Sequence, residues 1–290
     1  MKYLIFSLRP KHWIKNFFIF LPLIFGGKLF VYPFNLKACL AFVFFSLASG
    51  AVYIINDIID LPKDRRHPIK KLRPLASGRI KVKTALTSAV LISLLAVIAS
   101  FFVNLYLGFI VIIYLISNLL YSFFLKEIVI IDVFSIGLFF LLRVIAGSFA
   151  SNVILSHWII IMTVLLALFL GFNKRRQEVR VFQRKASSYR SVLKKYQPYF
   201  IDQMIAVITS SIVVVYMLYT IDARTVKELG TNKLIYSIPF VYYGIFRYLY
   251  LINRQVKDGD PTRLLLFDKM LQLNILLWIF VCITVIYLPI

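Results

Sequence analysis

The chain has 290 residues, of which 61% are hydrophobic, and its mean hydropathy is +0.85. Soluble globular domains are about 45–50% apolar, so this composition excludes a soluble enzyme and indicates an integral membrane protein. The net charge of +22 comes from 34 Lys and Arg residues against 12 Asp and Glu residues. Most of these cations lie between apolar runs, as they do in membrane proteins, which argues against nucleic acid as a partner.

Nine apolar runs follow one another along the chain, and each approaches or exceeds the roughly 20 residues that a membrane-spanning helix needs. They cover residues 14–33, 36–56, 84–104, 105–125, 128–150, 155–172, 201–221, 233–252 and 270–290. Runs of this length favour helices in lipid. We therefore predict an all-α, polytopic membrane protein with a single domain over residues 1–290, in which residues 1–13 form a short interfacial helix.

The distribution of basic residues predicts the orientation in the membrane. With the amino terminus in the cytoplasm, 27 of the 34 Lys and Arg residues lie on the cytoplasmic side, 5 lie outside, and Arg143 and Arg247 lie within apolar runs. Such an excess marks cytoplasmic loops. We predict a multi-pass protein of the cell membrane whose carboxyl terminus is outside. The three long loops, 57–83, 173–200 and 253–269, then share the cytoplasmic face, where we expect the active site.

The second run ends in the sequence NDIIDLPKD, which places Asn56, Asp57, Asp60 and Asp64 close together. Carboxylates at the end of a membrane helix are costly and usually functional. Their i, i+3, i+7 spacing puts the three aspartates on one face if the helix continues. Grouped oxygen ligands suit Mg²⁺, which also binds substrate phosphates. We predict that the aspartates are catalytic and, with Asn56, hold Mg²⁺ beside a diphosphate. A polar turn before Pro62 is the alternative.

These residues resemble the first aspartate-rich motif of the UbiA superfamily of membrane prenyltransferases. The four polar residues are followed by Arg73-Pro74, as in that motif. The resemblance implies nine transmembrane helices around a central cavity that cytoplasmic loops cap. Most of the superfamily carries a second acidic motif after the sixth helix, but the corresponding stretch here reads GFNKRRQE, from Gly171 to Glu178.

That basic stretch is similar to the decaprenyl-phosphate 5-phosphoribosyltransferase branch of the superfamily. The amino-terminal RPKHWIKN, the loop sequence DRRHP and the later SYR also resemble this branch. The resemblance covers essentially the whole chain. It implies substrate-binding roles for polar residues of these stretches, of the aspartate-rich motif and of the loop that follows it, namely Lys15, Asn16, Asn56, Arg65, His67, Lys71, Arg73, Lys174, Arg175, Arg176, Glu178 and Arg190.

Acidic and basic stretches together fit a reaction with several phosphate groups. Phosphoribosyl diphosphate and a polyprenyl phosphate bring a leaving diphosphate, a sugar phosphate and a lipid phosphate. A carboxylate–Mg²⁺ cluster suits the first, while Arg and Lys suit the others. The alternative for Lys174, Arg175 and Arg176 is ordinary anchoring of a helix end at the membrane surface.

Four more polar residues lie in or beside apolar runs and are candidates for substrate binding. Arg143 and Arg247 are expected to face a cavity or a partner, because an Arg facing lipid at mid-span is costly. Tyr121 and Lys126 follow Asn118 and could line the mouth of the site. For each of them, a structural hydrogen bond or ion pair between helices is the alternative.

We therefore expect an enzyme that uses Mg²⁺ to transfer a 5-phosphoribosyl group from phosphoribosyl diphosphate to a polyprenyl phosphate such as decaprenyl phosphate. Its partners would be these two substrates and membrane lipid, with no nucleic acid; a homo-oligomer is left open. An aromatic prenyltransferase that uses a polyprenyl diphosphate is the first alternative. An anion transporter or channel is the second, and would require Gly- or Pro-interrupted half-helices.

Overall fold

The computed structural model describes residues 2–66, 69–184, 191–254 and 268–288, and within them it contains helices and no strand. Eight of these helices are long and apolar enough to cross a membrane. Each of the last eight predicted runs overlaps one of them. The structure thus confirms an all-α, multi-pass membrane protein, whereas the orientation in the membrane and the central cavity stay predictions.

The first predicted run, 14–33, does not form one long helix. It is divided between the 3₁₀ helix η1, Pro10–Phe20, and the short helix α2, Leu21–Phe25. Pro22 stands in the first turn of α2, and Gly26-Gly27 ends it, with Gly27 at φ 69°. Proline begins helices and glycine ends them, so these residues explain why eight helices, rather than nine, have full membrane-spanning length in the described residues.

The chain divides into two compact units, Met1–Leu155 and Ser156–Ile290, and each is described by itself. The prediction of a single domain therefore stays a prediction. Unit 1 contains α1 (Lys2–Ser7), η1, α2, α3 (Phe34–Ile59), α4 (Leu61–Arg66), η2 (Lys70–Leu72), α5 (Val82–Val103), α6 (Leu105–Phe123), η3 (Leu125–Glu127) and α7 (Ile131–Ser151). Unit 2 contains α8 (His157–Arg184), η4 (Ser191–Lys195), α9 (Pro198–Ile221), α10 (Ala223–Leu229), η5 (Lys233–Ser237), α11 (Ile238–Arg254) and α13 (Lys269–Tyr287).

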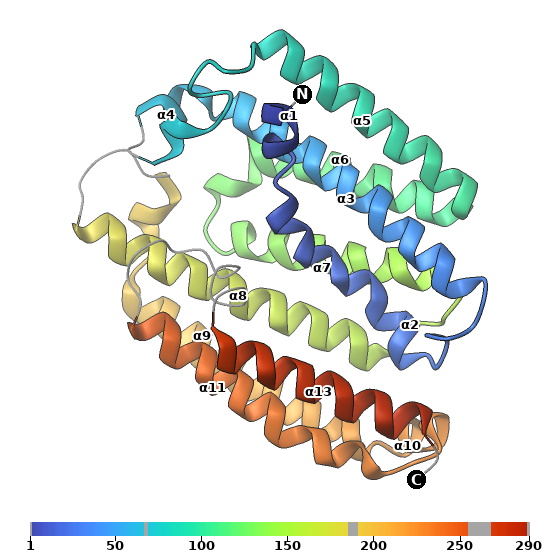
Figure 1. The fold of residues 1–290 in the computed structure, drawn as a ribbon. Coiled ribbons are helices and arrows are strands. Elements are labelled where there is room, and N and C mark those ends of the chain that lie inside the picture. The colour runs from blue at the N-terminus through green and yellow to red at the C-terminus, as the bar shows by residue number, and fades with distance from the viewer. Residues whose placement is uncertain (1, 67–68, 185–190, 255–267, 289–290) are drawn as a thin grey trace. The chain divides into compact units, whose positions relative to one another are not determined.

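Helix α3 is the centre of unit 1. It packs against α5, α6, α7 and η1, as Figure 1 shows for the blue and green part of the chain. Phe45 and Val52 of α3 join Leu107 and Val111 of α6 in the buried core. By contrast, α5 is mostly exposed. A membrane helix with an apolar, exposed surface faces lipid, so the functional polar groups of unit 1 are to be sought on α3 and its inner neighbours.

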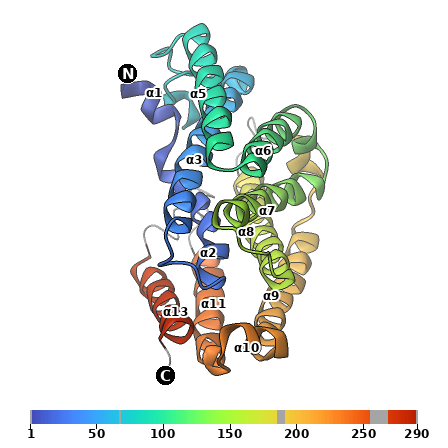
Figure 2. The same cartoon turned by 90° about the vertical axis from the view of Figure 1, so that its right-hand side faces the viewer.

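Unit 2 consists of two packed helix pairs, α8 with α9 and α11 with α13 (Figure 2). A buried polar network joins them at one end. The Tyr216 hydroxyl lies 2.6 Å from the Ser237 hydroxyl and accepts a hydrogen bond of 2.9 Å from the Trp278 indole. Polar groups in a membrane interior need such partners, so this network fixes α9 against η5 and α13.

Two glycines let the amino-terminal segment lie directly on the helices of unit 1. A Cβ atom at Gly147 of α7 would stand 1.9 Å from the Ile19 carbonyl oxygen, and one at Gly50 of α3 would stand 2.8 Å from the Leu8 side chain. A larger residue would push η1 off α7 at Gly147, or Leu8 off α3 at Gly50. These contacts place the start of the chain beside the acidic end of α3.

We predict that Gly147→Ala lowers the thermal unfolding temperature of the purified protein in detergent. Overpacking of a close contact costs about 1–3 kcal/mol, and the atom in the way is backbone, which cannot rotate aside. Gly244→Ala in α11 is the matched control, because its Cβ would meet only the Asn274 side-chain amide, at 2.9 Å. Equal unfolding temperatures for the two variants would contradict the proposed packing of η1.

The predicted orientation can be tested with reporter proteins that show on which side of the membrane a segment of the chain lies. A reporter fused after Ile290 should lie outside the cytoplasm, and one inserted between residues 185 and 190 should lie inside, because the basic loops stay in the cytoplasm. Alkaline phosphatase and green fluorescent protein fusions measure the two sides. Both reporters on the same side would refute the predicted topology.

Candidate functional site

The acidic motif lies where α3 ends and α4 begins. Helix α3 ends at Ile59, Asp60 leaves helical geometry with ψ 2°, and α4 starts at Leu61 with Pro62 in its first turn. A proline is tolerated in the first turn because it needs no hydrogen-bond donor there. The helix is therefore interrupted at Asp60, and the continuous face expected from the spacing of the three aspartates is divided.

Asp57 and Asp64 share one cation. Nη1 of Arg73 donates hydrogen bonds to Asp57 Oδ1 at 3.0 Å and to Asp64 Oδ2 at 2.5 Å. Nη2 of Arg9 donates to the same Asp57 oxygen at 2.5 Å. Both carboxylates are buried, with 5% and 4% of their side chains exposed. Buried carboxylates need such partners, so two arginines neutralise two aspartates here.

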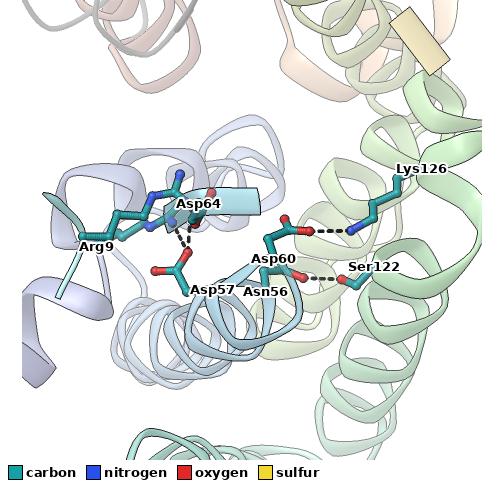
Figure 3. Close-up of polar contacts among 8 residues, drawn as sticks. Arg9, Asn56, Asp57, Asp60, Asp64, Ser122 and Lys126 are labelled. Carbon is teal, nitrogen blue, oxygen red and sulfur yellow. Dashed lines mark hydrogen bonds and ion pairs between the residues drawn. The ribbon is translucent and has the colours of Figure 1, made fainter. Parts of the chain in front are cut away.

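The side chains of Asn56 and Asp60 point away from the two arginines that bind Asp57 and Asp64. Figure 3 shows them directed toward Ser122 and Lys126, whereas Asp57 and Asp64 are directed toward Arg9. The Ser122 hydroxyl of α6 donates to the Asn56 amide oxygen, and Nζ of Lys126 in η3 donates to Asp60 Oδ1 at 2.9 Å. The acidic motif thus has two faces, one on the arginines and one on α6 and η3.

The donor set of the first face fits a hard divalent cation. Asp57 and Asp64 already converge on one positively charged nitrogen, that of Arg73. Two carboxylates completed by water and phosphate oxygens are a usual Mg²⁺ site. In the residues that the structure describes, no three acidic, His or Cys side chains are grouped so as to hold one metal ion. The four-residue ligand set, Asn56, Asp57, Asp60 and Asp64, therefore stays a prediction.

Asn16 and Arg143, both predicted to bind substrate, bind each other. Nε of Arg143 donates to the Asn16 side-chain oxygen at 2.7 Å, Nη1 to the Phe139 carbonyl at 2.6 Å and Nη2 to the Tyr114 hydroxyl at 3.1 Å. Asn16 in turn donates to Ser46 of α3 at 2.8 Å. Asn16 is 1% exposed and Arg143 is 4% exposed. In this arrangement they hold η1 between α3 and α7.

The remaining candidates of unit 1 are more accessible. Arg65 and Lys71 are exposed, and Lys15 and Tyr121 are partly buried. The Tyr121 ring packs edge-on against Phe139, with centroids 5.6 Å apart. His67 lies outside the described residues. The substrate-binding roles of these five residues stay predictions.

The basic stretch of unit 2 lies on α8, and two of its arginines have partners within that unit. Arg175 is 1% exposed and donates to Glu178 one turn later. Arg176 forms an ion pair with Asp202 of α9 and donates to Asn253 of α11. Lys174 is partly buried. Arg176 therefore joins α8 to α9 and α11, while anchoring of this helix end at the membrane surface stays the alternative for the stretch.

Arg247 is held by a carboxylate at the start of the last helix. Its Nη2 lies 2.8 Å from Asp268 Oδ2, and Nε donates to Oδ1 at 3.2 Å. Asp268 also caps α13 by accepting from the Leu271 amide at 2.8 Å. The hydrogen bonds from Arg247 lower the pKa of Asp268 below its ordinary value. Arg190, also predicted to bind substrate, lies outside the described residues.

Two residues of the acidic motif's surroundings were not among the predicted site residues. Arg9 contacts Asp57 from 48 positions away, and Ser122 contacts Asn56 from 66 positions away. The sequence could have identified Arg9 as a site residue, because Arg9 is the first residue of the RPKHWIKN stretch that carries the resemblance. Ser122 had only its place four residues after Asn118 in an apolar run.

Comparison with known proteins agrees with this description. A model of the UbiA prenyltransferase family matches residues 17–275. The decaprenyl-phosphate phosphoribosyltransferase of Mycobacterium tuberculosis is 30% identical over 277 residues, which cover 94% of this chain and 90% of the relative. The protein of the same name from Corynebacterium glutamicum is 30% identical and covers 97% and 86% of the two chains.

Among solved structures, a UbiA homolog from Archaeoglobus fulgidus bound to DMAPP and Mg²⁺ has a TM-score of 0.72 at 20% identity, over 100% of both chains. A UbiA homolog from Aeropyrum pernix has a TM-score of 0.66 at 18% identity and covers 94% of this chain and 98% of its own. At these identities the likeness concerns the fold. Both the family model and the relatives extend over nearly the whole sequence, and the chain belongs to the UbiA prenyltransferase family.

Proposed function

We propose that the protein transfers a 5-phosphoribosyl group from phosphoribosyl diphosphate to a polyprenyl phosphate such as decaprenyl phosphate and releases diphosphate. The observation that carries the proposal is the 30% identity to proteins named decaprenyl-phosphate phosphoribosyltransferase, which extends over 94% of the chain. The basic stretch on α8, where most of the superfamily is acidic, supports the same choice. We place the reaction at the cytoplasmic face of the cell membrane, where the basic loops are predicted to lie.

The residues of unit 1 supply the environment for the leaving group. Asp57 and Asp64 would hold Mg²⁺, with Asn56 and Asp60 in support. When bound, the ion supplies positive charge that neutralises the departing diphosphate. Arg73, whose side chain is 27% exposed, is placed to bind phosphate oxygens as well as carboxylates. Burial of Asp57 and Asp64 keeps water from competing for these contacts.

The acceptor needs little activation by the protein. A polyprenyl phosphate is already an anion, so no strong general base is required. The anomeric carbon gains positive character as diphosphate leaves, and fixed charges stabilise that state. This agrees with the chain's 3 histidines. We propose that Lys174 and Arg175 bind a phosphate of the sugar or the lipid, and that Arg176 mainly anchors α8.

The direct test is an assay of transfer. Purified protein in detergent is incubated with labelled phosphoribosyl diphosphate and polyprenyl phosphate, with and without Mg²⁺, and labelled lipid is measured by chromatography. Mg²⁺-dependent lipid labelling is expected. Transfer of a prenyl group from a prenyl diphosphate to an aromatic acid, without any need for phosphoribosyl diphosphate, would instead favour the aromatic prenyltransferase.

Asp57→Asn and Asp64→Asn should each reduce turnover by orders of magnitude, because loss of a metal ligand removes part of the several kcal/mol that a bound cation supplies to the transition state. Turnover is measured by the transfer assay on variants that elute as a single peak in size-exclusion chromatography. Glu127→Gln is the matched control, since Glu127 lies in the same unit and its ion pair with Lys63 measures 4.0 Å. Near wild-type turnover in both aspartate variants would refute the proposed metal site.

Lys174→Ala and Arg175→Ala should raise the apparent KM for phosphoribosyl diphosphate or for polyprenyl phosphate. Loss of a charge-assisted hydrogen bond costs about 1.5–3 kcal/mol, or roughly ten- to a hundredfold. Steady-state kinetics with each substrate varied in turn measures the change. Lys195→Ala removes an exposed charge after the same helix and serves as the control. Lower expression or thermal stability with an unchanged KM would identify the stretch as a helix anchor.

A further inference from the structure

Arg9 occupies a position in the acidic motif that depends on an unusual backbone. It has φ 52° and ψ 62°, in the left-handed region, just before Pro10. Residues other than glycine adopt this region rarely and at a cost. The conformation directs the side chain to α3, where the guanidinium lies 5.0 Å from the Tyr53 ring centroid and its Nη2 lies 2.5 Å from Asp57.

The surrounding contacts hold this backbone in place. Leu8 packs on Gly50 of α3, where a Cβ atom would be 2.8 Å from its side chain. The Trp13 indole donates to the Leu8 carbonyl at 3.3 Å. Arg9 is thus fixed on both sides along the chain, while its own side chain remains 23% exposed. Arg9 thus has a strained backbone that its neighbours hold in place, and its charge lies in the acidic motif. Strain of this kind is often part of a functional mechanism.

The charges of the cluster balance without any metal. Asp57 and Asp64 contribute two negative charges, and Arg9 and Arg73 contribute two positive charges. Both guanidinium groups donate to the same oxygen, Asp57 Oδ1. A divalent cation that binds this carboxylate would share its oxygen lone pairs with two arginines and would stand within a few ångströms of their charges. Like charges so close repel strongly at a site shielded from water.

We infer that Arg9 is a resident counter-cation of Asp57 that a divalent metal ion must displace, so that metal binding is coupled to the position of the amino-terminal segment. The inference deepens the proposed function, because it concerns the same metal site. Arg9 is the arginine that leaves more readily: it is held by one carboxylate, whereas Arg73 is held by two.

The displaced side chain keeps one favourable contact. Its guanidinium lies 5.0 Å from the Tyr53 ring centroid, and this ring can retain the cation once the Asp57 contact is lost. A phosphate anion that arrives with the metal would attract the freed guanidinium. Any ligand that favours the displaced position raises the affinity for the metal, and the metal raises the affinity for that ligand by the same factor.

The test is a titration with Mn²⁺ in the absence of substrate, in which free Mn²⁺ is measured by electron paramagnetic resonance. Arg9→Gln should bind Mn²⁺ on the order of tenfold more tightly than the wild type, because a charge-assisted contact no longer competes for the carboxylate. Lys11→Gln removes the same charge from an exposed side chain two residues away, and its affinity should stay at the wild-type value. Asp57→Asn in the Arg9→Gln background should abolish the gain.

A second measurement needs no change at Arg9. In a protein with Trp158→Phe and Trp278→Phe, Trp13 is the remaining one of the chain's 3 tryptophans. Its emission should change as Mg²⁺ is added, and the change should disappear with Asp57→Asn.

The inference would be overturned if Arg9→Gln and Lys11→Gln bound Mn²⁺ with equal affinity. It would also be overturned if the Trp13 emission did not change when Mg²⁺ is added. Neither measurement uses phosphoribosyl diphosphate or lipid. Metal displacement of Arg9 can therefore hold even if the transfer assay fails, and transfer can occur even if Arg9 does not compete.

Discussion

The structure of unit 1 depends on the neutralisation of one buried carboxylate. Asp57 lies near the end of a membrane-spanning helix, with 5% of its side chain exposed, and an unpaired charge there would be strongly unfavourable. Arg9 approaches from the segment before α3, and Arg73 approaches from the loop after it. Because both arginines must reach one oxygen, the chain on either side of α3 folds back onto its end. The acidic motif is therefore a structural centre as well as a candidate catalytic one.

Arg143 is a buried cation of the same unit, and its charge is stabilised without a carboxylate among its hydrogen-bond partners. Arg143 is satisfied by an amide oxygen, a backbone carbonyl and a tyrosine hydroxyl, and its guanidinium lies between the rings of Phe45, Tyr114 and Phe140. Aromatic faces attract cations, most strongly where water is excluded. The two sets of contacts fix η1 at two points: Arg9, just before its first residue, binds the acidic motif, and Asn16, within the helix, binds Arg143. The short 3₁₀ helix is thus positioned by polar contacts as much as by apolar ones.

The helices and the acidic motif were predictable from sequence, but the partners of the polar residues were not. Runs of about 20 apolar residues leave few alternatives to helices in lipid, and eight of the nine predicted runs overlap a helix of spanning length. The exception is the run broken by Pro22 and Gly26-Gly27. Pairings such as Arg143 with Asn16, 127 positions apart, follow from tertiary packing alone. Helical periodicity also predicted that Asp57, Asp60 and Asp64 share one face. That prediction assumed a continuous helix, and the structure interrupts the helix at Asp60.

The order of residues along the chain has a consequence for how the protein enters the membrane. Arg9 is synthesised 48 residues before Asp57, and Arg73 follows 16 residues after it. Chains fold from the amino terminus as they leave the ribosome. When the end of α3 leaves the ribosome, Arg9 has already been synthesised and can pair with Asp57. Arg73 follows soon afterwards and can pair with the same carboxylate. The carboxylate can therefore be paired during insertion, before any of the later helices exist.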